Sequence, residues 1–592
     1  MKDYTRLFDL LPYQQSNHPQ AICLAEKVTE NGQKFYKGYS TQECINIINQ
    51  LSKALLKLGV KPNDKIGLIS NNRPQWNFVD LAAQQIGAIN VPVYPTITES
   101  EYKFIFNDAE IVYCFVSDAD LYAKIQSIKS DIPSLKDVFT FNEVAGAKNW
   151  KTLLEEVSAD DLKQIETLKA AIKPNDLATI IYTSGTTGNP KGVMLSHNNI
   201  ISNIKSTLSI QQMMVAGKRS LSFLPLCHSF ERMVVYTYFA VGMSVYYAET
   251  LETIGENLKE VKPHFFTTVP RLLEKVYEKI MEKGNALEGF RKKLFFWSID
   301  LGLRFELNKF QGISYTLQLA IARKLVFSKW KEALGGEVEA LVSGAAALNA
   351  KLGTLFTGAG IPIIEGYGLT ETSPVLTSNR LEEKDRKLGT IGIPIPGVEI
   401  KIAEDGEILA KGPNIMLGYY KRPDLTAEVI DKDGWFHTGD IGVYEGKFLK
   451  ITDRKKELFK TSGGKYVAPQ PIENKMKESP LIEQVMVVGS ERKFVSGLIV
   501  PSFVNLEGWC KNNNVIFPGN AGVIRIPEVI EAIQKEVERI NQDINHVEQI
   551  KKFTLLPAEW GVATGELTPT MKLKRKVILE KFSTEIEAMY KE

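Results

Sequence analysis

Apolar side chains alternate between helical and strand-like spacing from the start of the chain to Asp176. At 39–58, isoleucine and leucine recur at nearly helical intervals, which predicts an amphipathic helix. The run KIGLIS at 65–70 predicts a short buried strand, residues 76–86 a second helix, and residues 88–93 a second strand. This alternation predicts an α/β fold with layered, mainly parallel sheets.

A different pattern occupies residues 278–334, which are helical in spacing and rich in basic and aromatic side chains. Two interpretations fit this pattern. In one, the region 288–331 makes a peripheral contact with a membrane, and Arg291, Lys292 and Lys293 face lipid phosphates. In the other, the segment is an amphipathic helical layer packed on a sheet. Helical spacing alone favours the second interpretation.

Beyond Gly389 the chain changes to short strand-like runs separated by glycine and proline turns, which predicts a small β-barrel or meander. A charged stretch, ITDRKKELFK at 451–460, then leads into mixed strands and helices. A chain of 592 residues is too long for a single core. We therefore predict a large N-terminal domain at 1–453, made of layered α/β sheets and the small barrel, and a small α+β domain at 454–592.

Composition narrows the class of protein. The chain is 44% apolar and 24% charged, and its net charge of +2 argues against a nucleic-acid-binding surface. Five cysteines lie far apart and six histidines form no HExxH motif, so we expect neither a disulfide framework nor a protein-held metal. The N-terminal residues do not resemble a secretory signal, and no apolar run reaches the roughly 18–20 residues that span a bilayer. We expect a cytoplasmic protein, either soluble or peripheral on the inner face of the membrane.

The segment most suggestive of chemistry is LATIIYTSGTTGNPKGVMLSH at 177–197. A strand-like apolar run leads into a cluster of glycine and hydroxyl residues, which Lys191 and Gly192 follow. Glycines let backbone N–H groups turn toward a ligand, hydroxyls add donors and lysine adds positive charge, so the segment is suited to hold a polyphosphate. It is not a Walker A loop, because glycine follows the lysine where that loop has serine or threonine. Composition alone leaves an ordinary polar turn equally open, but the string YTSGTTGNPKG is far rarer than its composition.

Further motifs follow along the chain: LPLCHSFER at 224–232, VSGAAALNAKL at 342–352, EGYGLTET at 365–372, DGWFHTGDIG at 433–442, DRKKEL at 453–458, SGGKYVAP at 462–469 and LTPTMKLKRK at 567–576. Each alone has an ordinary structural interpretation, because single histidines, small-residue runs and basic tails are usually structural or solvated. In this order, the motifs resemble the adenylate-forming superfamily of acyl-CoA synthetases, adenylation domains and beetle luciferases. More narrowly, they resemble the long-chain fatty acyl-CoA synthetases. The resemblance extends from about residue 39 to residue 576.

The resemblance implies a nucleotide site built from these motifs. Lys191 and the hydroxyl loop hold the phosphates of ATP, Tyr367 stacks on adenine, and Asp440 accepts hydrogen bonds from the ribose hydroxyls with help from Arg454. Implied contacts with ATP or CoA come from Thr183, Ser184, Gly185, Thr186, Thr187, Gly188, Lys191, Gly344, Ala345, Glu365, Gly366, Tyr367, Thr370, Asp440, Arg454, Lys456, Gly464 and Lys572.

The resemblance also implies catalytic and metal-binding residues. Glu371 and Thr186 hold Mg²⁺ against the phosphates, since carboxylate and hydroxyl oxygens suit this hard cation. Thr370 binds near the α-phosphate, and His228 lies near the carboxylate of the acid and the acyl entrance. The implied catalytic set is Lys572, Glu371, Thr370, Lys191 and His228.

The last motifs imply a mobile C-terminal domain. Lys456 occupies the hinge position of the family, and the glycines around Gly464 let the rotated domain approach the pantetheine channel. Lys572 aligns with the lysine that contacts the α-phosphate, although Met571 stands where many relatives have glycine. That departure leaves Lys574 as an alternative, and spacing favours Lys572.

The implied activity is that of a long-chain fatty acid–CoA ligase. The enzyme first forms acyl-AMP and pyrophosphate from a fatty acid and Mg-ATP, and then transfers the acyl group to the thiol of CoA. Three alternatives stay open: an acyl-AMP ligase that loads a carrier protein, a luciferase-like oxygenase, and a non-catalytic fatty-acid- or nucleotide-binding protein. No carrier module follows Glu592, which favours CoA as the acceptor. The preferred chain length and the oligomeric state do not follow from the sequence.

Overall fold

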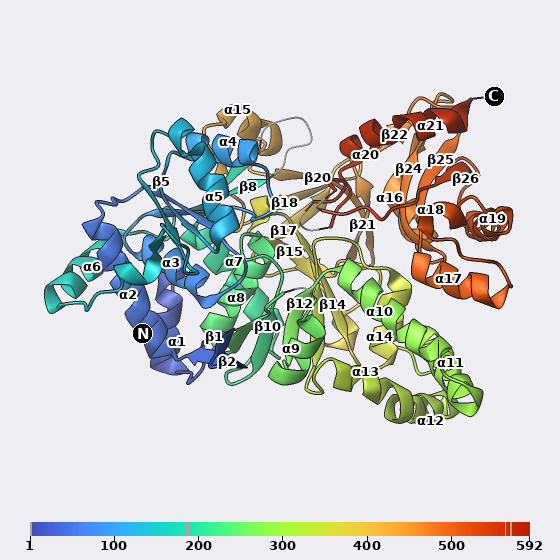
Figure 1. The fold of residues 1–592 in the computed structure, drawn as a ribbon, viewed down its shortest axis with the longest axis horizontal. Helices are drawn as coiled ribbons and strands as arrows, with labels where there is room; N and C mark the ends of the chain where they lie inside the picture. The colour runs from blue at the N-terminus through green and yellow to red at the C-terminus, as the bar shows by residue number, and fades with distance from the viewer. Residues whose placement is uncertain (1–2, 184–189, 251, 563, 569–570, 592) are drawn as a thin grey trace.

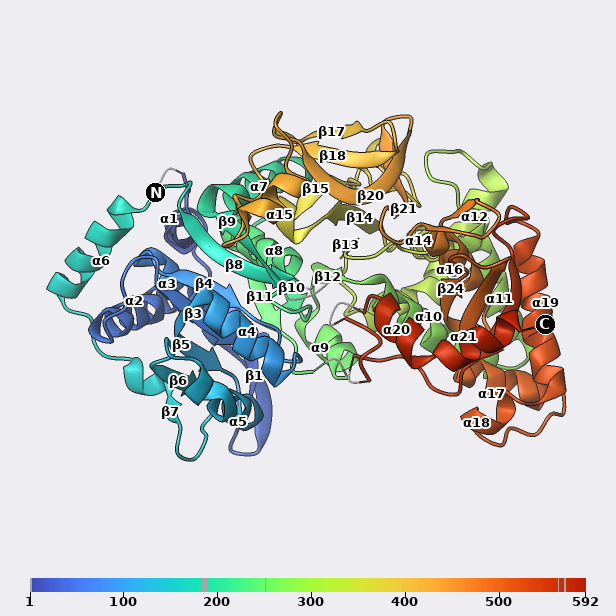
Figure 2. The same ribbon diagram turned by 90° about the horizontal axis from the view of Figure 1, so that it is seen from above.

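The computed structural model describes residues 3–183, 190–250, 252–562, 564–568 and 571–591. Figure 1 shows a large body that contains both N-terminal sheets, with a smaller C-terminal part at one end. The perpendicular view in Figure 2 shows the same division. None of the helices in the described ranges combines the length and apolar composition that crossing a bilayer requires.

An eight-stranded sheet contains the strands predicted near the N-terminus. Its strands are β3 (Lys65–Ile69), β4 (Ile89–Pro92), β5 (Ile111–Val116), β6 (Asp137–Thr140), β7 (Lys148–Asn149), β8 (Leu177–Thr183), β9 (Lys191–Ser196) and β19 (Gly418–Tyr419). They lie in the order β19–β9–β8–β4–β3–β5–β6–β7, and every pairing from β8 to β7 is parallel. Only β9 and β19 are antiparallel to their neighbours.

A nine-stranded sheet forms the second layer. Its strands are β1 (Leu24–Glu30), β2 (Gln33–Tyr39), β10 (Arg219–Ser222), β11 (Ser244–Tyr247), β12 (Phe265–Thr268), β13 (Ala340–Ser343), β14 (Ile363–Gly368), β15 (Val375–Ser378) and β16 (Ile393–Pro394). The order is β16–β15–β14–β13–β12–β10–β11–β1–β2, with parallel pairing from β14 to β1. The predicted α/β fold with mainly parallel sheets is confirmed.

Helices cover the sheets and fill the space between them. The longer ones in the first part of the chain are α1 (Leu10–Asn17), α2 (Thr41–Lys57), α3 (Pro74–Gln85), α4 (Glu99–Ala109), α5 (Ala119–Ile128), α6 (Ala159–Ala171), α7 (His197–Ile210), α8 (Ser229–Val241) and α9 (Ile254–Val261). Short 3₁₀ turns are η1 (Leu7–Asp9), η2 (Lys129–Asp131), η3 (Trp150–Leu153), η5 (Thr370–Thr372) and η6 (Glu383–Asp385). The predicted helix at 39–58 is α2, which begins where the Ser40 hydroxyl accepts from the Glu43 N–H.

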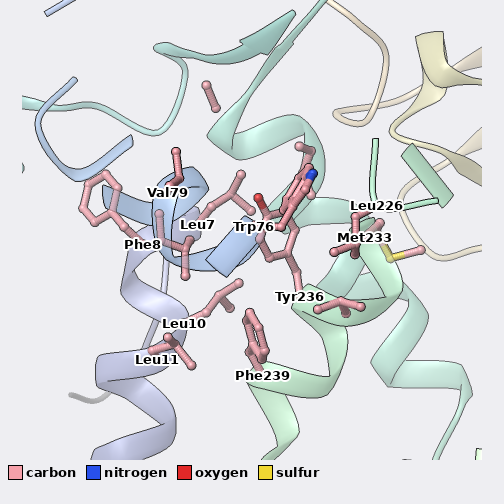
Figure 3. Packing of buried hydrophobic residues seen from close by; sticks show 14 of the residues in the cluster. Leu7, Phe8, Leu10, Leu11, Trp76, Val79, Leu226, Met233, Tyr236 and Phe239 are labelled. Carbon is pink, nitrogen blue, oxygen red and sulfur yellow. The ribbon is translucent and has the colours of Figure 1, made fainter. Parts of the chain in front are cut away.

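The main core lies where α1, α3 and α8 meet. Figure 3 shows Leu10, Trp76, Tyr236 and Phe239 close together where these helices meet. Every residue of α3 is buried, which explains its weak helical periodicity. Its polar residues therefore need partners inside the protein.

Residues 278–334 are helical, as predicted. They belong to α10 (Pro270–Asn285), α11 (Gly289–Leu303), α12 (Ile313–Ala322), the π-helical turn η4 (Arg323–Phe327) and α13 (Ser328–Ala333). With α14 (Ala350–Gly358), they enclose a second core next to the nine-stranded sheet. This layer accounts for the amphipathic spacing.

The region beyond Gly389 forms an antiparallel meander. Its strands are β17 (Glu399–Ile402), β18 (Glu407–Lys411), β20 (Phe436–Glu445) and β21 (Phe448–Arg454), and α15 (Pro423–Val429) lies between β18 and β20 in sequence. No ladder joins β17 to β21 among the described residues, so hydrogen bonding leaves this sheet open where a barrel was one expectation.

The C-terminal part has its own core, which runs from Val467 to Met589. It is built from β22 (Phe459–Lys460), β23 (Tyr466–Val467), α16 (Pro469–Met476), β24 (Ile482–Val488), β25 (Val495–Pro501), α17 (Phe503–Asn512), α18 (Asn520–Val523), α19 (Pro527–Asn541), β26 (Ile550–Leu555), α20 (Arg575–Lys581) and α21 (Ser583–Tyr590). Its three-stranded sheet has the order β24–β25–β26.

Candidate active site

Four sequence motifs begin at or just after the carboxyl ends of strands in the two large sheets. The glycine-rich segment follows β8, LPLCHSFER follows β10, VSGAAALNAKL begins at the end of β13, and EGYGLTET begins within β14. Carboxyl ends of parallel strands share one edge of a sheet, and ligands of open α/β sheets bind at that edge. The topology therefore gathers these motifs.

The glycine-rich segment joins β8 to β9 as a hairpin. Thr183 pairs with Lys191 across the two strands and closes it. The predicted phosphate-binding residues Ser184, Gly185, Thr186, Thr187 and Gly188 lie outside the described residues. Lys191 is the first residue of β9, and its ammonium nitrogen lies 5.0 Å from the centre of the Tyr419 ring.

Tyr419 links Lys191 to Glu371. Its strand, β19, pairs with β9, and its hydroxyl donates to Oε1 of Glu371 at 2.9 Å. The Met416 N–H donates to the backbone carbonyl of Glu371 at 2.8 Å, which fixes the η5 turn that carries this carboxylate. Burial and the Glu371 charge raise the pKa of the Tyr419 phenol, so it remains a donor near pH 7. The sequence gives no sign of this role, because it depends on the pairing of β19 with β9.

The carboxylate of Glu371 fits a magnesium ion. Only Oε1 receives a hydrogen bond among the described residues, and carboxylate oxygens are the ligands that Mg²⁺ prefers. Within the same ranges no group of three or more His, Cys, Asp or Glu side chains could hold a metal. Mg²⁺ bound at Glu371 would therefore have few protein ligands, and phosphate oxygens and water would supply the others.

A buried carboxylate, Asp440, contacts Tyr367 of the EGYGLTET motif. Asp440 is 4% exposed and accepts from the Tyr367 hydroxyl at 2.6 Å. Nε of Arg454, its cross-strand partner on β21, lies 3.3 Å from Oδ1. Burial raises the pKa of Asp440, and the Arg454 charge opposes that rise. EGYGLTET and DGWFHTGDIG therefore meet in space.

Lys572 of the C-terminal part lies within electrostatic range of this carboxylate. Enclosure of its ammonium and repulsion from Arg454 lower its pKa to about 8, whereas Asp440, Glu457 and Glu371 act in the opposite direction. Lys574 immediately precedes α20, and no interaction among the described residues joins its side chain to Asp440 or Glu371.

Met571 has a backbone conformation that favours glycine. Its φ is 63°, and its N–H donates to the Thr568 carbonyl at 2.7 Å. The Lys572 N–H donates to the Thr568 hydroxyl at 3.0 Å. This geometry explains why a glycine suits the position before the lysine.

His228 caps α8. Its Nδ1 accepts from the Phe230 N–H at 3.2 Å, and the next hydroxyl, Ser229, donates to Thr370 at 3.4 Å. Burial and the nearby Lys572 lower the pKa of His228 to about 4. The imidazole is therefore neutral near pH 7 and lies within electrostatic range of the C-terminal lysine.

Small residues stand at the end of β13. A side chain at Gly344 would place its Cβ 3.0 Å from the Phe230 ring, so glycine allows this close packing. Ala345 has a φ of 67°, in the left-handed region. The Ser343 hydroxyl is buried and has no hydrogen-bond partner among the described residues, which leaves it available to a ligand.

The remaining predicted residues make no hydrogen bond or ion pair with Lys191, Glu371 or Asp440 among the described residues. Burial raises the pKa of Glu365 to about 8, and its carboxyl accepts from the backbone N–H groups of Gly389 and Leu348. Gly366 pairs with Ser378 between β14 and β15. Lys456 is exposed just past β21, and Gly464, with a φ of 78°, lies in the turn between β22 and β23.

The end of LPLCHSFER is structural. Arg232 is 1% exposed and lies 2.5 Å from Asp80 of α3, with further hydrogen bonds to Thr179 of β8 and Tyr236. Burial raises the pKa of Glu231 to about 7, and its carboxyl accepts from two hydroxyls on β10 and β12. These two charged residues brace the sheets below the site, a role that sequence spacing does not indicate.

We expect Arg232→Met to destabilise the N-terminal part by ~3 kcal/mol or more, because it leaves Asp80 as a buried carboxylate without its cation. Urea unfolding measures the loss. Arg422→Met is the matched control, since its 2.8 Å pair with Asp424 is exposed. Adding Asp80→Asn should restore part of the stability, and equal midpoints for the two single variants would contradict the interpretation.

Comparison with known families covers nearly the whole chain. Residues 12–420 match the family described as AMP-binding enzyme, and residues 457–592 match the AMP-binding enzyme C-terminal domain. The chain is 36% identical over 556 residues to the long-chain-fatty-acid–CoA ligase FadD15 of Mycobacterium tuberculosis, covering 93% of this chain and 91% of that protein. It is 32% identical over 589 residues to human long-chain-fatty-acid–CoA ligase 1, covering 94% and 82%.

Solved structures with the same fold are more distant in sequence. The adenylation domain of a carboxylate reductase from Mycobacterium chelonae superimposes with a TM-score of 0.75 at 21% identity, covering 99% of this chain and 91% of that one. A Mycobacterium tuberculosis fatty acyl CoA synthetase superimposes with a TM-score of 0.61 at 19% identity, covering 98% and 99%. At such identities the likeness concerns the fold.

Proposed function

Because the chain belongs to the AMP-binding enzyme family, we propose that its site joins a long-chain fatty acid to CoA in two steps with acyl-AMP as the intermediate. The protein is an AMP-forming acid–thiol ligase that uses ATP, Mg²⁺ and CoA, like the long-chain-fatty-acid–CoA ligases that it resembles over most of its length. The carboxylate of the acid attacks the α-phosphorus of ATP, pyrophosphate leaves, and the CoA thiol then displaces AMP.

One observation carries the assignment of this site. Lys191, Glu371 and Asp440 come from segments far apart in the sequence and lie around a single site, with Lys572 of the C-terminal part within electrostatic range of the two carboxylates. Such an arrangement provides cations for phosphates and carboxylates for a metal ion and a ribose. A non-catalytic binding protein has no need of the last lysine.

In the first step the residues have separate roles. Asp440 accepts from the ribose hydroxyls, and Tyr367, held by its bond to Asp440, lies against adenine. Lys191 binds the departing phosphates, and Lys572 binds the α-phosphate as charge develops there. Thr370, which accepts from the Ser229 hydroxyl, lies near the α-phosphate, and neutral His228, which caps α8, lies near the carboxylate of the acid. When bound, Mg²⁺ neutralises phosphate charge, and Glu371 would hold it.

The second step requires the C-terminal part to turn. We place the domain boundary between Asp453 and Arg454, at the end of β21, and the hinge at Lys456. Support comes from the separate core of residues 467–589 and from the exposure of Lys456. The turn removes Lys572 from the site and brings the loop with Gly464 toward the acyl-AMP, so that the thiol can enter.

The contact between the two parts is polar and contains a carboxyl pair. Arg271 and Glu278 of α10 both contact Glu483 of β24. Burial, then a hydrogen bond to Glu483, raises the pKa of Glu278 to about 8, and the pKa of Glu483 is lowered. Glu274 and Lys275 of α10 and Glu559 of the C-terminal part are further charged groups here, and Lys351 of α14 pairs with Glu478 of the C-terminal part at 2.5 Å.

This pair makes the docked arrangement depend on pH. Docking raises the pKa of Glu278 from 4.5 to about 8, so between these values Glu278 takes up a proton when the two parts dock. Docking is therefore favoured at low pH and weakens as the pH rises. Above about pH 8 Glu278 no longer stabilises the docked arrangement by taking up a proton. Glu278→Gln, whose amide N–H can still donate to Glu483, should remove this dependence. Energy transfer between dyes on the two parts at pH 6.5 and 8.5 measures docking. An unchanged pH dependence in Glu278→Gln would contradict the shared proton.

We further propose a cytoplasmic location with a peripheral contact to the membrane through the helices of residues 288–331. The proposed substrate supports this idea, because long-chain fatty acids partition into bilayers.

The activity test separates this reaction from its alternatives. The purified chain is incubated with ATP, Mg²⁺ and a series of saturated and unsaturated fatty acids, with either CoA or a phosphopantetheinyl carrier protein as acceptor. We expect AMP and acyl-CoA in equal amounts with CoA, and little transfer to the carrier. Transfer to the carrier alone would indicate an acyl-AMP ligase. Absence of acid-dependent pyrophosphate release would indicate a non-catalytic protein.

A further inference from the structure

An apolar stripe runs along the outer face of α12 and η4. Its members are Ile313, Leu317, Ile321 and Leu325, which are 72%, 60%, 50% and 53% exposed. Figure 1 shows α12 at the lower edge of the molecule, on the outside of the helical layer. Large apolar side chains gathered on one helix face seldom stay in water without a partner.

The opposite face of the same helices holds them in place. Leu319, Ala322, Phe327 and Trp330 are buried in the core shared with α11 and α14. The stripe is therefore a second apolar face and does not serve to pack the layer on the protein. This differs from an ordinary amphipathic helix, whose outer face is polar.

The π-helical turn keeps the stripe in line. In an uninterrupted α-helix, Leu325 would be turned by about 120° from Ile313, because each residue adds about 100°. The π-helical turn Arg323–Phe327 rotates the chain less per residue, so Leu325, its third residue, lies closer in angle to Ile313 than in an uninterrupted α-helix. Phe310, which is 76% exposed, precedes α12 in the adjoining loop and adds an aromatic side chain at its start.

Cations outnumber carboxylates along the stripe, although Lys309 pairs with Glu306 at 2.7 Å and Lys329 pairs with Glu332 at 3.0 Å. From residue 307 to residue 331 the chain has no aspartate or glutamate, and its cations are Lys309, Arg323, Lys324, Lys329 and Lys331. Lys324 adjoins Leu325, is exposed, and has no carboxylate partner among the described residues. Arg291, Lys292 and Lys293 lie instead at the start of α11, away from the stripe in sequence, and Lys292 donates to the Asn285 carbonyl.

We propose that this stripe inserts into the surface of an anionic lipid bilayer, with the neighbouring cations contacting lipid phosphates. An exposed apolar helix face bordered by lysine and arginine binds such surfaces through buried apolar area together with electrostatic attraction. A second copy of the chain is disfavoured, since a two-fold contact brings the cations of both copies together. Membrane binding would bring the enzyme to the bilayer in which its fatty acid is concentrated, and this benefit rests on the proposed function.

Vesicle flotation with the full-length chain tests this proposal without ATP, acid or CoA, so its result is independent of catalysis. We use vesicles of phosphatidylcholine alone or mixed with phosphatidylglycerol. The wild type should float with the anionic vesicles and less with the neutral ones, and added salt should weaken binding. Leu317→Asp/Ile321→Asp should lower the bound fraction by about tenfold or more, and Lys324→Glu should lower it less.

Ile516→Asp is the matched control, because Ile516 is 83% exposed in the C-terminal part, far from the stripe in sequence. It should bind like the wild type, and unchanged circular dichroism and melting temperature in all variants exclude misfolding. Equal binding of the wild type and the double variant, or no binding of the wild type to anionic vesicles, would overturn the proposal. A wild-type dimer that becomes monomeric in the double variant would assign the stripe to self-association instead.

Discussion

Lys572→Ala should lower the rate of acid-dependent adenylation by about 10²–10³, because removing a charged donor from a developing oxyanion has this effect in other enzymes. The same variant should convert preformed acyl-AMP to acyl-CoA at nearly the wild-type rate, since the proposed turn of the C-terminal part withdraws Lys572 before the thiol attacks. Pyrophosphate release measures the first step, and thioester formation from synthetic acyl-AMP measures the second.

Lys574→Ala is the control for this result. It lies two residues further along the chain, and no interaction joins its side chain to the site carboxylates among the described residues. It should leave both half-reactions within about threefold of the wild type, as expected for a half-buried residue without a contact to the site. Equal damage to both half-reactions in Lys572→Ala would reject the assignment, as would a larger loss in Lys574→Ala than in Lys572→Ala.

Lys456→Pro should produce the opposite pattern. Proline fixes φ at its own position and restricts the residue before it, so it stiffens the linker about which the C-terminal part turns. Because the docked arrangement already places Lys572 near Asp440, adenylation should continue. Thioester formation should fall by about tenfold or more, as when hinge residues are altered in other enzymes.

The control for the hinge is Lys456→Ala. The Lys456 side chain is exposed and has no hydrogen bond or ion pair among the described residues, so its removal should change little. The comparison therefore separates the backbone effect of proline from the loss of a charge. Unchanged thioester formation in Lys456→Pro would place the axis of movement elsewhere.

The sequence predicted the parts of the fold that depend on local pattern. The helix at 39–58, the strand at 65–70 and the parallel arrangement of the sheets follow from spacing and are all present. Periodicity could not indicate that α3 is buried on every side, nor that its Asp80 pairs with Arg232 at 2.5 Å. That pair joins residues from two helices, and only the tertiary structure brings them together.

The candidate site, too, could be predicted from the sequence only in part. Motif resemblance pointed to Lys191, Glu371, Asp440 and Lys572, and the structure brings them into one region. It did not point to Tyr419, which holds Glu371 through a hydroxyl on a two-residue strand. Nor could sequence indicate the line of the apolar stripe, since a π-helical turn at Arg323–Phe327 changes the helical phase at Leu325.

A crystal structure of the chain with ATP, Mg²⁺ and a non-reactive fatty acid analogue tests the convergence of these residues most directly. We predict adenine beside Tyr367, the ribose hydroxyls on Asp440, and the α-phosphate within reach of the Lys572 ammonium. Nucleotide bound at another place, or a C-terminal lysine that cannot reach the α-phosphate in any arrangement of the two parts, would contradict the account.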